Sequence, residues 1–394
     1  MRFPEFDGEW HHTTIGDCCS PLEYGMNAPA KEYDGANKYI RITDIDEDTC
    51  TYKCDDVVSP NAQLEDKYRV RKNDILFART GASTGKAYLY NEEDGLMYYA
   101  GFLIRGNVKP AYNAKFVFLQ TQTQKYKKWV DIMSIRSGQP GINSQEYSGF
   151  KFHLPPSKVE QDKISTLFTL LDERITTQIR IIDKLQSLMK GLNDYLQDSL
   201  PLSYSLSFSD IGEDYSGLSG KSAEDFGSGK PYITYVSIYA NNFVEDDCCG
   251  KVSVKRDEKQ SVVQKGDMLF TLSSETPEEV CYGAVYSGNS TETYLNSFCF
   301  GVRNTEGKVF SPYMAYFFNS SRFRREVFPL AQGSTRFNLQ KSDFLQKQFS
   351  YPSIDDQHRI FKILNAYDNK LKVENQILAH YQHQKEFLLR NLFI

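Results

Sequence analysis

Pro156-Ser-Lys-Val-Glu-Gln-Asp-Lys-Ile164 opens the stretch that decides the fold, a helical pattern that continues to Gln197. Its apolar residues are spaced three and four apart, as on one face of a long helix. Because no Pro or capping Gly interrupts the pattern before Pro201, the sequence predicts one helix of about 40 residues and roughly 60 Å. The apolar positions are Ile164, Phe168, Leu171, Ile175, Ile179, Ile182, Leu185, Met189, Leu192 and Leu196.

The same pattern recurs 196 residues later. Eight of the ten equivalent positions are again apolar or aromatic, and Asn375 and Lys385 interrupt the face. The openings match as well, since Gln161 recurs as Gln357. The chain therefore contains two copies of the long helix. The equivalent positions are Ile360, Leu364, Tyr367, Leu371, Asn375, Leu378, Tyr381, Lys385, Leu388 and Leu392.

A shorter, mixed pattern precedes each helix. Asp74-Ile-Leu-Phe77 is typical of a strand that enters a turn, and residues 114–130 have the spacing of an amphipathic helix. Both features recur in the second half, as Asp267-Met-Leu-Phe270 and residues 311–327. The halves share little between these pieces, which predicts a common fold that carries different surfaces.

The repeat divides the chain into four segments. We expect small mixed α/β domains at residues 1–155 and 201–351, and long helices at residues 156–200 and 352–394. Residues 201–229 are rich in Ser, Gly and acidic residues, so they are predicted to form a linker. The fold class is therefore α+β with a pseudo-two-fold internal repeat.

The composition favours a folded binding protein. Apolar residues make up 40% of the chain and aromatic residues 14%, which is enough for packed cores. A net charge of −5 argues against coating nucleic acid by bulk electrostatics, although local basic segments such as Lys125-Tyr-Lys-Lys128 remain. With no signal-peptide core and no run of about 18 apolar residues, a cytoplasmic protein without membrane contact is expected.

Polar residues follow the predicted strand in both halves. Hydroxyl, guanidinium and ammonium groups on a short loop can reach base edges and phosphates of DNA, and two hairpin turns with polar tips explain them equally well. A nucleotide phosphate loop is disfavoured because strand-like Ala87-Tyr-Leu-Tyr90 follows, where a P-loop continues into a helix. The candidates are Arg79, Thr80, Ser83, Thr84 and Lys86 in the first half, and Ser273 and Ser274 in the second.

A second set of candidates lies just before each long helix. Asn143 and Asn338 are aligned at an offset of 195, and we interpret both as turn or capping residues. The other residues are types that bind bases. They are Arg136 and Gln139 in the first half, and Ser334, Thr335 and Arg336 in the second.

The common catalytic and metal-binding motifs are absent from the sequence. Gly-x-Ser-x-Gly, Gly-x-Gly-x-x-Gly, His-Glu-x-x-His and the Pro-Pro-Tyr motifs of methyltransferases do not occur. The acidic run at Asp44 lacks the Gly and Glu of a calcium loop, and the eight cysteines lack zinc-ribbon spacing. We therefore expect no catalytic, cofactor-binding or metal-binding residues in this chain.

Several short motifs occur in a fixed order. They are Phe3-Pro-Glu-Phe6 with Gly8-Glu-Trp10, Asp74-Ile-Leu-Phe-Ala-Arg-Thr-Gly81 with Gly85-Lys86, and Gly138 with Asn143. The helix openings follow, as Pro156-x-x-x-Glu-Gln-x-x-Ile164 before Leu171-Asp172, and Pro352-x-x-x-Asp-Gln-x-x-Ile360 before Tyr367-Asp368. This duplicated order covers nearly the whole chain and resembles the DNA specificity subunits of type I restriction-modification systems.

The resemblance implies two target-recognition domains that each read one half of a split DNA sequence. Two antiparallel, coiled-coil helices would hold these domains apart and set the spacing of the half-sites. The implied partners are two methyltransferase subunits, which carry S-adenosylmethionine and methylate adenine N6, and translocating endonuclease subunits. This chain would supply specificity without catalysis.

The helix faces are the expected binding sites for one another and for the methyltransferase subunits. Alternative functions are a helical scaffold that binds only protein, and an enzyme with an unrecognised site. The positions expected to bind partners are Ile164, Leu171, Ile175, Ile182, Leu185, Ile360, Tyr367, Leu371, Leu378 and Leu388.

Overall fold

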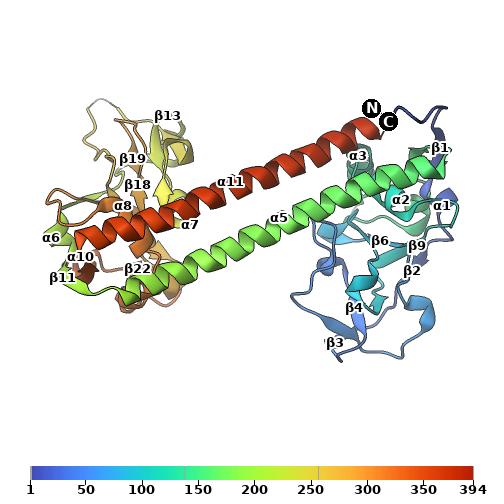
Figure 1. Cartoon of the computed structure of the whole chain (residues 1–394), viewed down its shortest axis with the longest axis horizontal. Coiled ribbons are helices and arrows are strands. Elements are labelled where there is room, and N and C mark those ends of the chain that lie inside the picture. The colour runs from blue at the N-terminus through green and yellow to red at the C-terminus, as the bar shows by residue number, and fades with distance from the viewer. Residues whose placement is uncertain (1, 137, 256, 394) are drawn as a thin grey trace. The chain divides into compact units, whose positions relative to one another are not determined.

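The computed structural model describes residues 2–136, 138–255 and 257–393, which form two compact units. The first unit comprises residues 1–179 and 376–394, and the second unit comprises residues 180–375. Two long helices dominate Figure 1, namely α5 (Lys158–Ser199) and α11 (Ile354–Leu392). They contain 42 and 39 residues, which confirms both predicted helices. Each helix contributes one part to each unit.

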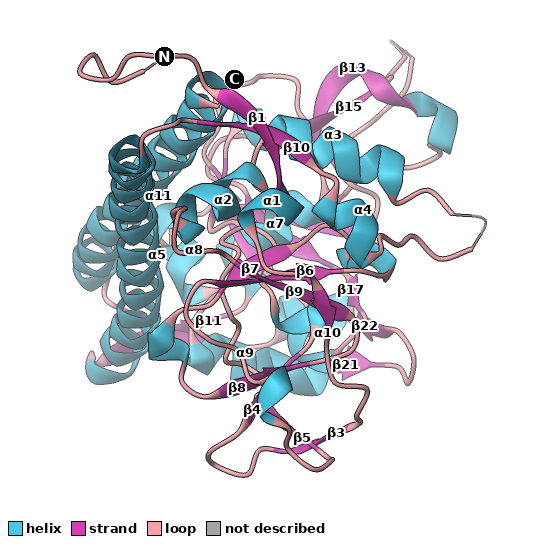
Figure 2. Cartoon of the chain, turned by 90° about the vertical axis from the view of Figure 1, so that its right-hand side faces the viewer, coloured by secondary structure: helices cyan, strands magenta, loops and turns pink. Residues whose placement is uncertain are grey.

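The first unit is built on an antiparallel sheet whose central strand β6 (Asp74–Ala78) is buried throughout. Ile75 and Phe77 face a core formed with helices α1 to α4, which lie beside this sheet in Figure 2. Leu76 and Ala78 face a second core on the other side, as the two-residue period of a strand requires. The sheet order is β2 (Glu23–Tyr24), β9 (Leu103–Asn107), β6, β7 (Ala87–Leu89). The helices are α1 (Ile15–Cys18), α2 (Ala114–Gln120), α3 (Gln124–Met133) and α4 (Ser144–Ser148).

The second unit repeats this plan around β16 (Met268–Thr271). Met268 and Phe270 face the core beneath α8 (Ser311–Phe317) and α9 (Ser321–Val327), whereas Leu269 faces the opposite core. The predicted strands Asp74–Phe77 and Asp267–Phe270 are therefore confirmed as the centre of each unit. The sheet order is β12 (Glu213–Ser216), β20 (Cys299–Arg303), β16, β18 (Gly283–Tyr286), β14 (Phe243–Val244).

Short strands and helices complete both units. In the first unit they are β1 (His11–Thr14), β3 (Ala30–Glu32), β4 (Lys38–Ile40), β5 (Val58–Pro60), β8 (Met97–Tyr99) and β10 (Lys151–Leu154). In the second unit they are β11 (Leu202–Leu206), α6 (Phe208–Ile211), β13 (Phe226–Ile233), α7 (Tyr235–Ala240), β15 (Cys249–Val252), β17 (Ser273–Ser274), β19 (Tyr294–Leu295), β21 (Ala331–Gln332), β22 (Phe337–Leu339), α10 (Lys341–Gln346) and β23 (Phe349–Pro352).

The linker predicted at residues 201–229 is wrong, because most of this segment belongs to the folded second unit. It contains β11, α6, β12 and the start of β13, and Phe208 and Ile211 are fully buried in the main core. A local signal was present: the capping box of Thr14 with Asp17 recurs as Ser207 with Asp210. Burial of two large apolar side chains outweighs the polar composition around them.

A buried glutamine anchors the start of each long helix. Gln161 Oε1 accepts a hydrogen bond from the Asn113 backbone N–H at 3.0 Å, and its Nε2 donates to the Pro155 carbonyl at 3.2 Å. Gln357 does the same in the second unit, accepting from the Phe310 N–H at 2.8 Å and donating to a proline carbonyl at 3.1 Å. The repeated glutamine therefore orients α5 and α11 on their own units, with its proline acceptor six residues before it in the first unit and five in the second.

The long helices run antiparallel where they meet in the first unit. Phe168 of α5 lies near Phe393, with ring centroids 5.8 Å apart, and Asp172 one turn further along α5 pairs with Lys385 of α11 at 2.8 Å. Asp172 also accepts a hydrogen bond from Lys115 of α2 at 2.7 Å. Lys385 interrupts the apolar face in the sequence. In the structure it pairs with the Asp172 carboxylate, which Lys115 also contacts.

The pKa of Asp172 makes the stability of the first unit depend on pH. Burial raises this pKa, but Lys115 and Lys385 outweigh burial, so the pKa lies below its ordinary value of 3.8. Because the folded-state pKa is lowered, the cluster stabilises the folded unit above pH ~4, and this contribution is lost as the pH falls through the folded-state pKa.

We expect Asp172→Asn to lower the free energy of unfolding of the first unit by about 1–2 kcal/mol at pH 7, between the values for exposed and buried ion pairs. Thermal melting of both proteins from pH 7 to pH 3 measures this, and the difference should shrink below pH ~4. Asp183→Asn, at an exposed position of α5, is the control. If the difference in thermal stability between wild type and Asp172→Asn did not change with pH, the stabilising role of the carboxylate charge would be contradicted.

Candidate nucleic-acid interface

Three chain segments meet at the end of β6 in the first unit. The Arg79 backbone N–H donates to the Phe102 carbonyl at 3.0 Å, and the Arg79 carbonyl accepts from the Ile142 N–H at 3.0 Å. Thr80 and Gly141 form a bridge beside them. We call this meeting point of residues 79–81, 101–102 and 139–142 the first junction. It brings together the two sets of DNA-contact candidates that the sequence places about 60 residues apart.

The second unit builds an equivalent junction at the end of β16. The Leu272 N–H donates to the Phe298 carbonyl at 2.9 Å, and the Leu272 carbonyl accepts from the Leu339 N–H at 2.8 Å. Residues 272–274, 297–298 and 332–339 form this second junction. The two units therefore present different side chains on the same backbone arrangement.

These hydrogen bonds correct one predicted alignment. Since Ile142 and Leu339 occupy equivalent places, Asn143 corresponds to Gln340 and not to Asn338. Asn143 caps α4, where its side chain accepts from the Glu146 N–H at 2.9 Å, and Gln340 stands at the matching cap position of α10. Asn338 instead lies in β22. The offset between the halves is 197 residues here, as it is between Asn113 and Phe310, and the alignment of the two asparagines at an offset of 195 missed this.

Arg79 is the prominent cation of the first junction. Its guanidinium carbon lies 4.8 Å from the centroid of the Tyr24 ring, a cation–π arrangement. The Tyr24 hydroxyl accepts a hydrogen bond from the Ser144 N–H at 3.2 Å. Burial raises the pKa of this phenol, but the Ser144 hydrogen bond and Arg79 outweigh burial and lower the pKa overall. Within the described residues, no carboxylate forms an ion pair with Arg79.

Arg136 is held by contacts inside the first unit. Its Nη2 donates to both carboxylate oxygens of Glu146 at 2.7 Å, and its Nη1 donates to the Met133 and Ile135 carbonyls at 2.8 and 2.9 Å. Glu146 also completes the capping box of α4. These contacts occupy the donors that a bidentate base contact would need, so they disfavour the role predicted for Arg136 and indicate that it positions α4.

The loop after the first junction combines internal contacts with accessible polar groups. Thr84 Oγ1 donates to the Gly81 carbonyl at 2.7 Å, and Lys86 Nζ pairs with Glu47 at 3.0 Å. Gly81, with a φ of +70°, lies against the side-chain amide of Gln139. Thr80 and Ser83 are half-buried and Gln139 is exposed, so their side chains remain accessible.

Of the five predicted DNA-contact residues at the second junction, two are buried and three are exposed. Ser273 and Ser274 are only 4% and 6% exposed, and Ser274 Oγ donates to Glu279 at 3.1 Å, so the prediction that they contact bases is wrong. Burial follows from the pairing of β17 with β22, which local sequence does not show. The exposed candidates are Ser334, Thr335 and Arg336. The Arg336 guanidinium lies 5.6 Å from the Phe298 ring centroid.

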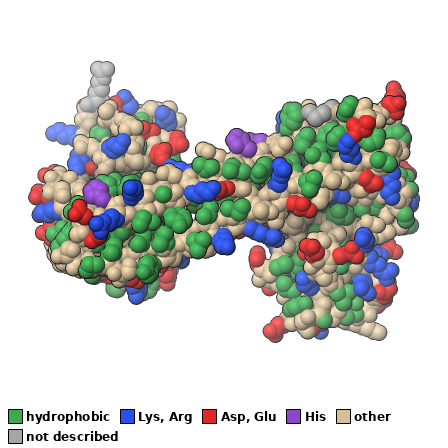
Figure 3. All heavy atoms as spheres, in the orientation of Figure 1, with side chains coloured by type: hydrophobic (Ala, Val, Ile, Leu, Met, Phe, Trp, Pro, Cys, Tyr) green, Lys and Arg blue, Asp and Glu red, His purple; other side chains and the backbone are tan. Residues whose placement is uncertain are grey.

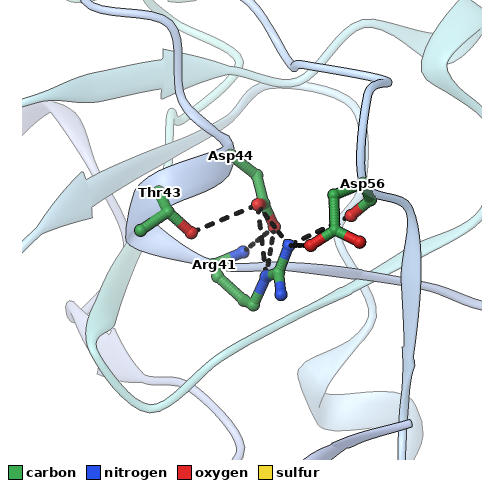
Figure 4. A network of polar contacts seen from close by, with 4 residues as sticks. All are labelled: Arg41, Thr43, Asp44 and Asp56. Atoms are coloured by element: carbon green, nitrogen blue, oxygen red, sulfur yellow. Dashed lines mark hydrogen bonds and ion pairs between the residues drawn. The ribbon is translucent and has the colours of Figure 1, made fainter. Parts of the chain in front are cut away.

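Charges elsewhere are largely mixed. On the face shown in Figure 3, Lys and Arg side chains are interspersed with Asp and Glu side chains over both units. The acidic run that begins at Asp44 forms a turn in which Arg41 contacts Asp44 at 2.8 Å and Asp56 at 2.9 Å (Figure 4). In the described part of the chain, no group of three His, Cys, Asp or Glu side chains could hold a metal ion.

The apolar face predicted on the long helices is largely covered within the chain. Ile164, Leu171, Ile175, Ile182 and Ile360 are buried. Leu185, Leu371, Leu378 and Leu388 are half-buried, and Tyr367 is 38% exposed. The five buried side chains are covered within the chain, which contradicts their predicted role as contacts with a partner subunit. Among the described residues, no helix is both long and apolar enough to cross a membrane.

One family model matches most of the chain, and solved structures share its fold. The model of the type I restriction modification DNA specificity domain matches residues 8–187 and 209–380. A similar fold occurs in the S subunit of a type I restriction-modification system from M. genitalium, with 15% identity, a TM-score of 0.59 and coverage of 98% of this chain and 96% of that chain. A chain from a type I R-M system studied for complex assembly and conformational transition has 13% identity, a TM-score of 0.58 and coverage of 97% and 98%.

Proposed function

The chain belongs to the type I restriction modification DNA specificity domain family, and we propose that each of its two units reads one half of a divided DNA target. The observation that carries this proposal is the pair of equivalent junctions with different side chains. Arg79 lies at the first junction and Arg336 at the second, each against an aromatic ring. Arginine donates bidentate hydrogen bonds to guanine, and a different set of donors at each junction selects a different sequence.

The reactions that follow recognition belong, in this proposal, to partner subunits. The chain directs adenine-N6 methylation and DNA restriction, and the methyltransferase partner carries S-adenosylmethionine. The purified chain incubated with S-adenosylmethionine and DNA should therefore leave the DNA unmethylated, and addition of the partner should restore methylation. Methylation by the chain alone would contradict the proposal. A scaffold that binds only protein is disfavoured, because it does not account for two equivalent junctions with unneutralised arginines.

We further propose that the two methyltransferase subunits bind exposed positions of the long helices. In the second unit, Ile181, Leu188 and Tyr195 of α5 are exposed and are spaced by seven residues, so they lie on one face of the helix. A line of exposed apolar side chains is typical of a surface that packs against a partner. Leu188→Asp should weaken assembly with the methyltransferase subunit, as measured by sedimentation, without altering the folding of the isolated chain.

Arg79 and Arg136 of the first unit give contrasting predictions. Arg79→Ala should weaken binding of the assembled complex to its specific DNA by about 1–3 kcal/mol, because a good bidentate base contact contributes this much. Arg136→Ala should change this affinity by less than about 0.5 kcal/mol, since its donors serve Glu146. Fluorescence anisotropy with a specific and a scrambled duplex measures both. Equal losses for the two variants would contradict the distinction.

A further inference from the structure

A phenylalanine occupies the same place at both junctions. Phe102 precedes β9 and Phe298 precedes β20, and their carbonyls accept the equivalent hydrogen bonds from Arg79 and Leu272. Each lies in a tight turn closed by a backbone hydrogen bond, from Leu103 to Ala100 at 2.8 Å and from Cys299 to Asn296 at 3.0 Å. The backbone thus presents both residues on a rigid scaffold.

Both rings face outward. Phe102 is 59% exposed and Phe298 is 55% exposed, although the core of each unit is rich in aromatic residues. A single exposed apolar residue is ordinary on a protein surface. The same residue type, exposed at equivalent positions of two units whose other junction residues differ, is not explained by packing within either unit.

The charges at the two junctions indicate that DNA, and not a protein, covers these rings. The Arg336 guanidinium lies over the Phe298 ring. In the first unit the Arg79 backbone N–H donates to the Phe102 carbonyl, and the Arg79 guanidinium lies over the Tyr24 ring. In the described residues, neither arginine forms an ion pair with a carboxylate. A guanidinium without an ion pair and an exposed phenylalanine ring at the same junction suit a base pair, which offers acceptors on guanine and an apolar methyl group on thymine.

We propose that Phe102 and Phe298 are base-contacting residues, one for each half of the DNA target, each acting together with the arginine of the same junction. This inference rests on the proposed function. The ring covers an apolar group of a base in the groove, and the arginine of the same junction donates hydrogen bonds to base acceptors. The junction then reads two adjacent features of the sequence with two side chains of different chemistry.

The test uses the complex assembled with its methyltransferase partner. Methylome sequencing of cells that express both subunits first identifies the two half-sites. Labelled duplexes then carry the full target, a scrambled first half-site or a scrambled second half-site. Phe102→Ala should bind the full target about tenfold more weakly than wild type, as loss of an aromatic contact to a base predicts. It should match wild type on the duplex in which its own half-site is scrambled.

Phe298→Ala should show the same pattern for the other half-site, so each variant serves as a control for the other. Phe102→Leu, which keeps an apolar side chain, should lose less than Phe102→Ala. Phe328→Ala removes an exposed phenylalanine that lies outside both junctions and both long helices, and it should leave DNA affinity unchanged. If wild type prefers no divided target, the proposed function fails.

If wild type is specific and the Phe102 and Phe298 variants bind normally, only this inference is overturned. An equal loss on all duplexes, or a loss of subunit assembly seen by sedimentation, overturns it as well.

Discussion

Exchange of residues 1–155 for the equivalent segment of another family member is expected to change one half of the methylated DNA sequence and to leave the other half unchanged. The physical reason is that each unit contains its own sheet, cores and junction. The hydrogen bonds described for the first junction, including that from Ser144 to Tyr24, join residues within the exchanged segment. Methylome sequencing of cells that express the exchanged chain measures the result directly.

The exchange has one structural requirement. The core of the first unit includes Ile164 and Phe168 of α5, which remain from the original chain. The donor segment therefore needs apolar residues at positions equivalent to Phe116 and Phe152, which share that core. Exchange of residues 201–351 is the reciprocal control and should change only the other half. A change in both halves from either exchange would show that the units do not read DNA independently.

Phe270→Ala should cause the largest loss of stability among the variants considered. Its ring centroid lies 4.8 Å from that of Phe318, 5.0 Å from that of Phe344, and 5.2 Å from those of Phe208 and Phe300. Removal of a phenyl group from such a core leaves a cavity and costs about 3–5 kcal/mol. Denaturant unfolding followed by hydrogen exchange should assign this loss to the second unit.

The effect of Phe270→Ala on DNA reading should be equally local. Leu272, whose backbone forms the second junction, follows Phe270 by two residues, so specificity should weaken for the second half-site first. Phe77→Ala is the matched variant, since Phe77 holds the equivalent place in β6 beside Tyr147. It should destabilise the first unit instead. If the free energy of unfolding fell by less than about 1 kcal/mol in either variant, the central position of these rings in the cores would be contradicted.

Three side chains have a surrounding that only partners distant in the sequence decide. Residues 202–216 have the composition of a linker, but Phe208 inserts into an aromatic core that forms only in the folded unit. Ser273 has the chemistry of a DNA contact, but the pairing of β17 with β22 buries it. Arg136 likewise suits a base contact, but Glu146 lies within reach of its guanidinium.

The sequence by itself determined the two long helices, the central strand of each unit and the duplicated plan, because burial of one helix or strand face imposes a spacing that the residues record directly. The repeated glutamines Gln161 and Gln357 are also visible in the sequence, since each forms hydrogen bonds near the start of its own helix. Only the tertiary structure decided which polar side chains are accessible at the junctions. Hydrogen bonds and burial between distant segments leave no period in the sequence, so the half-buried position of Arg79 and the exposure of Phe102 and Phe298 had to be found in the folded chain.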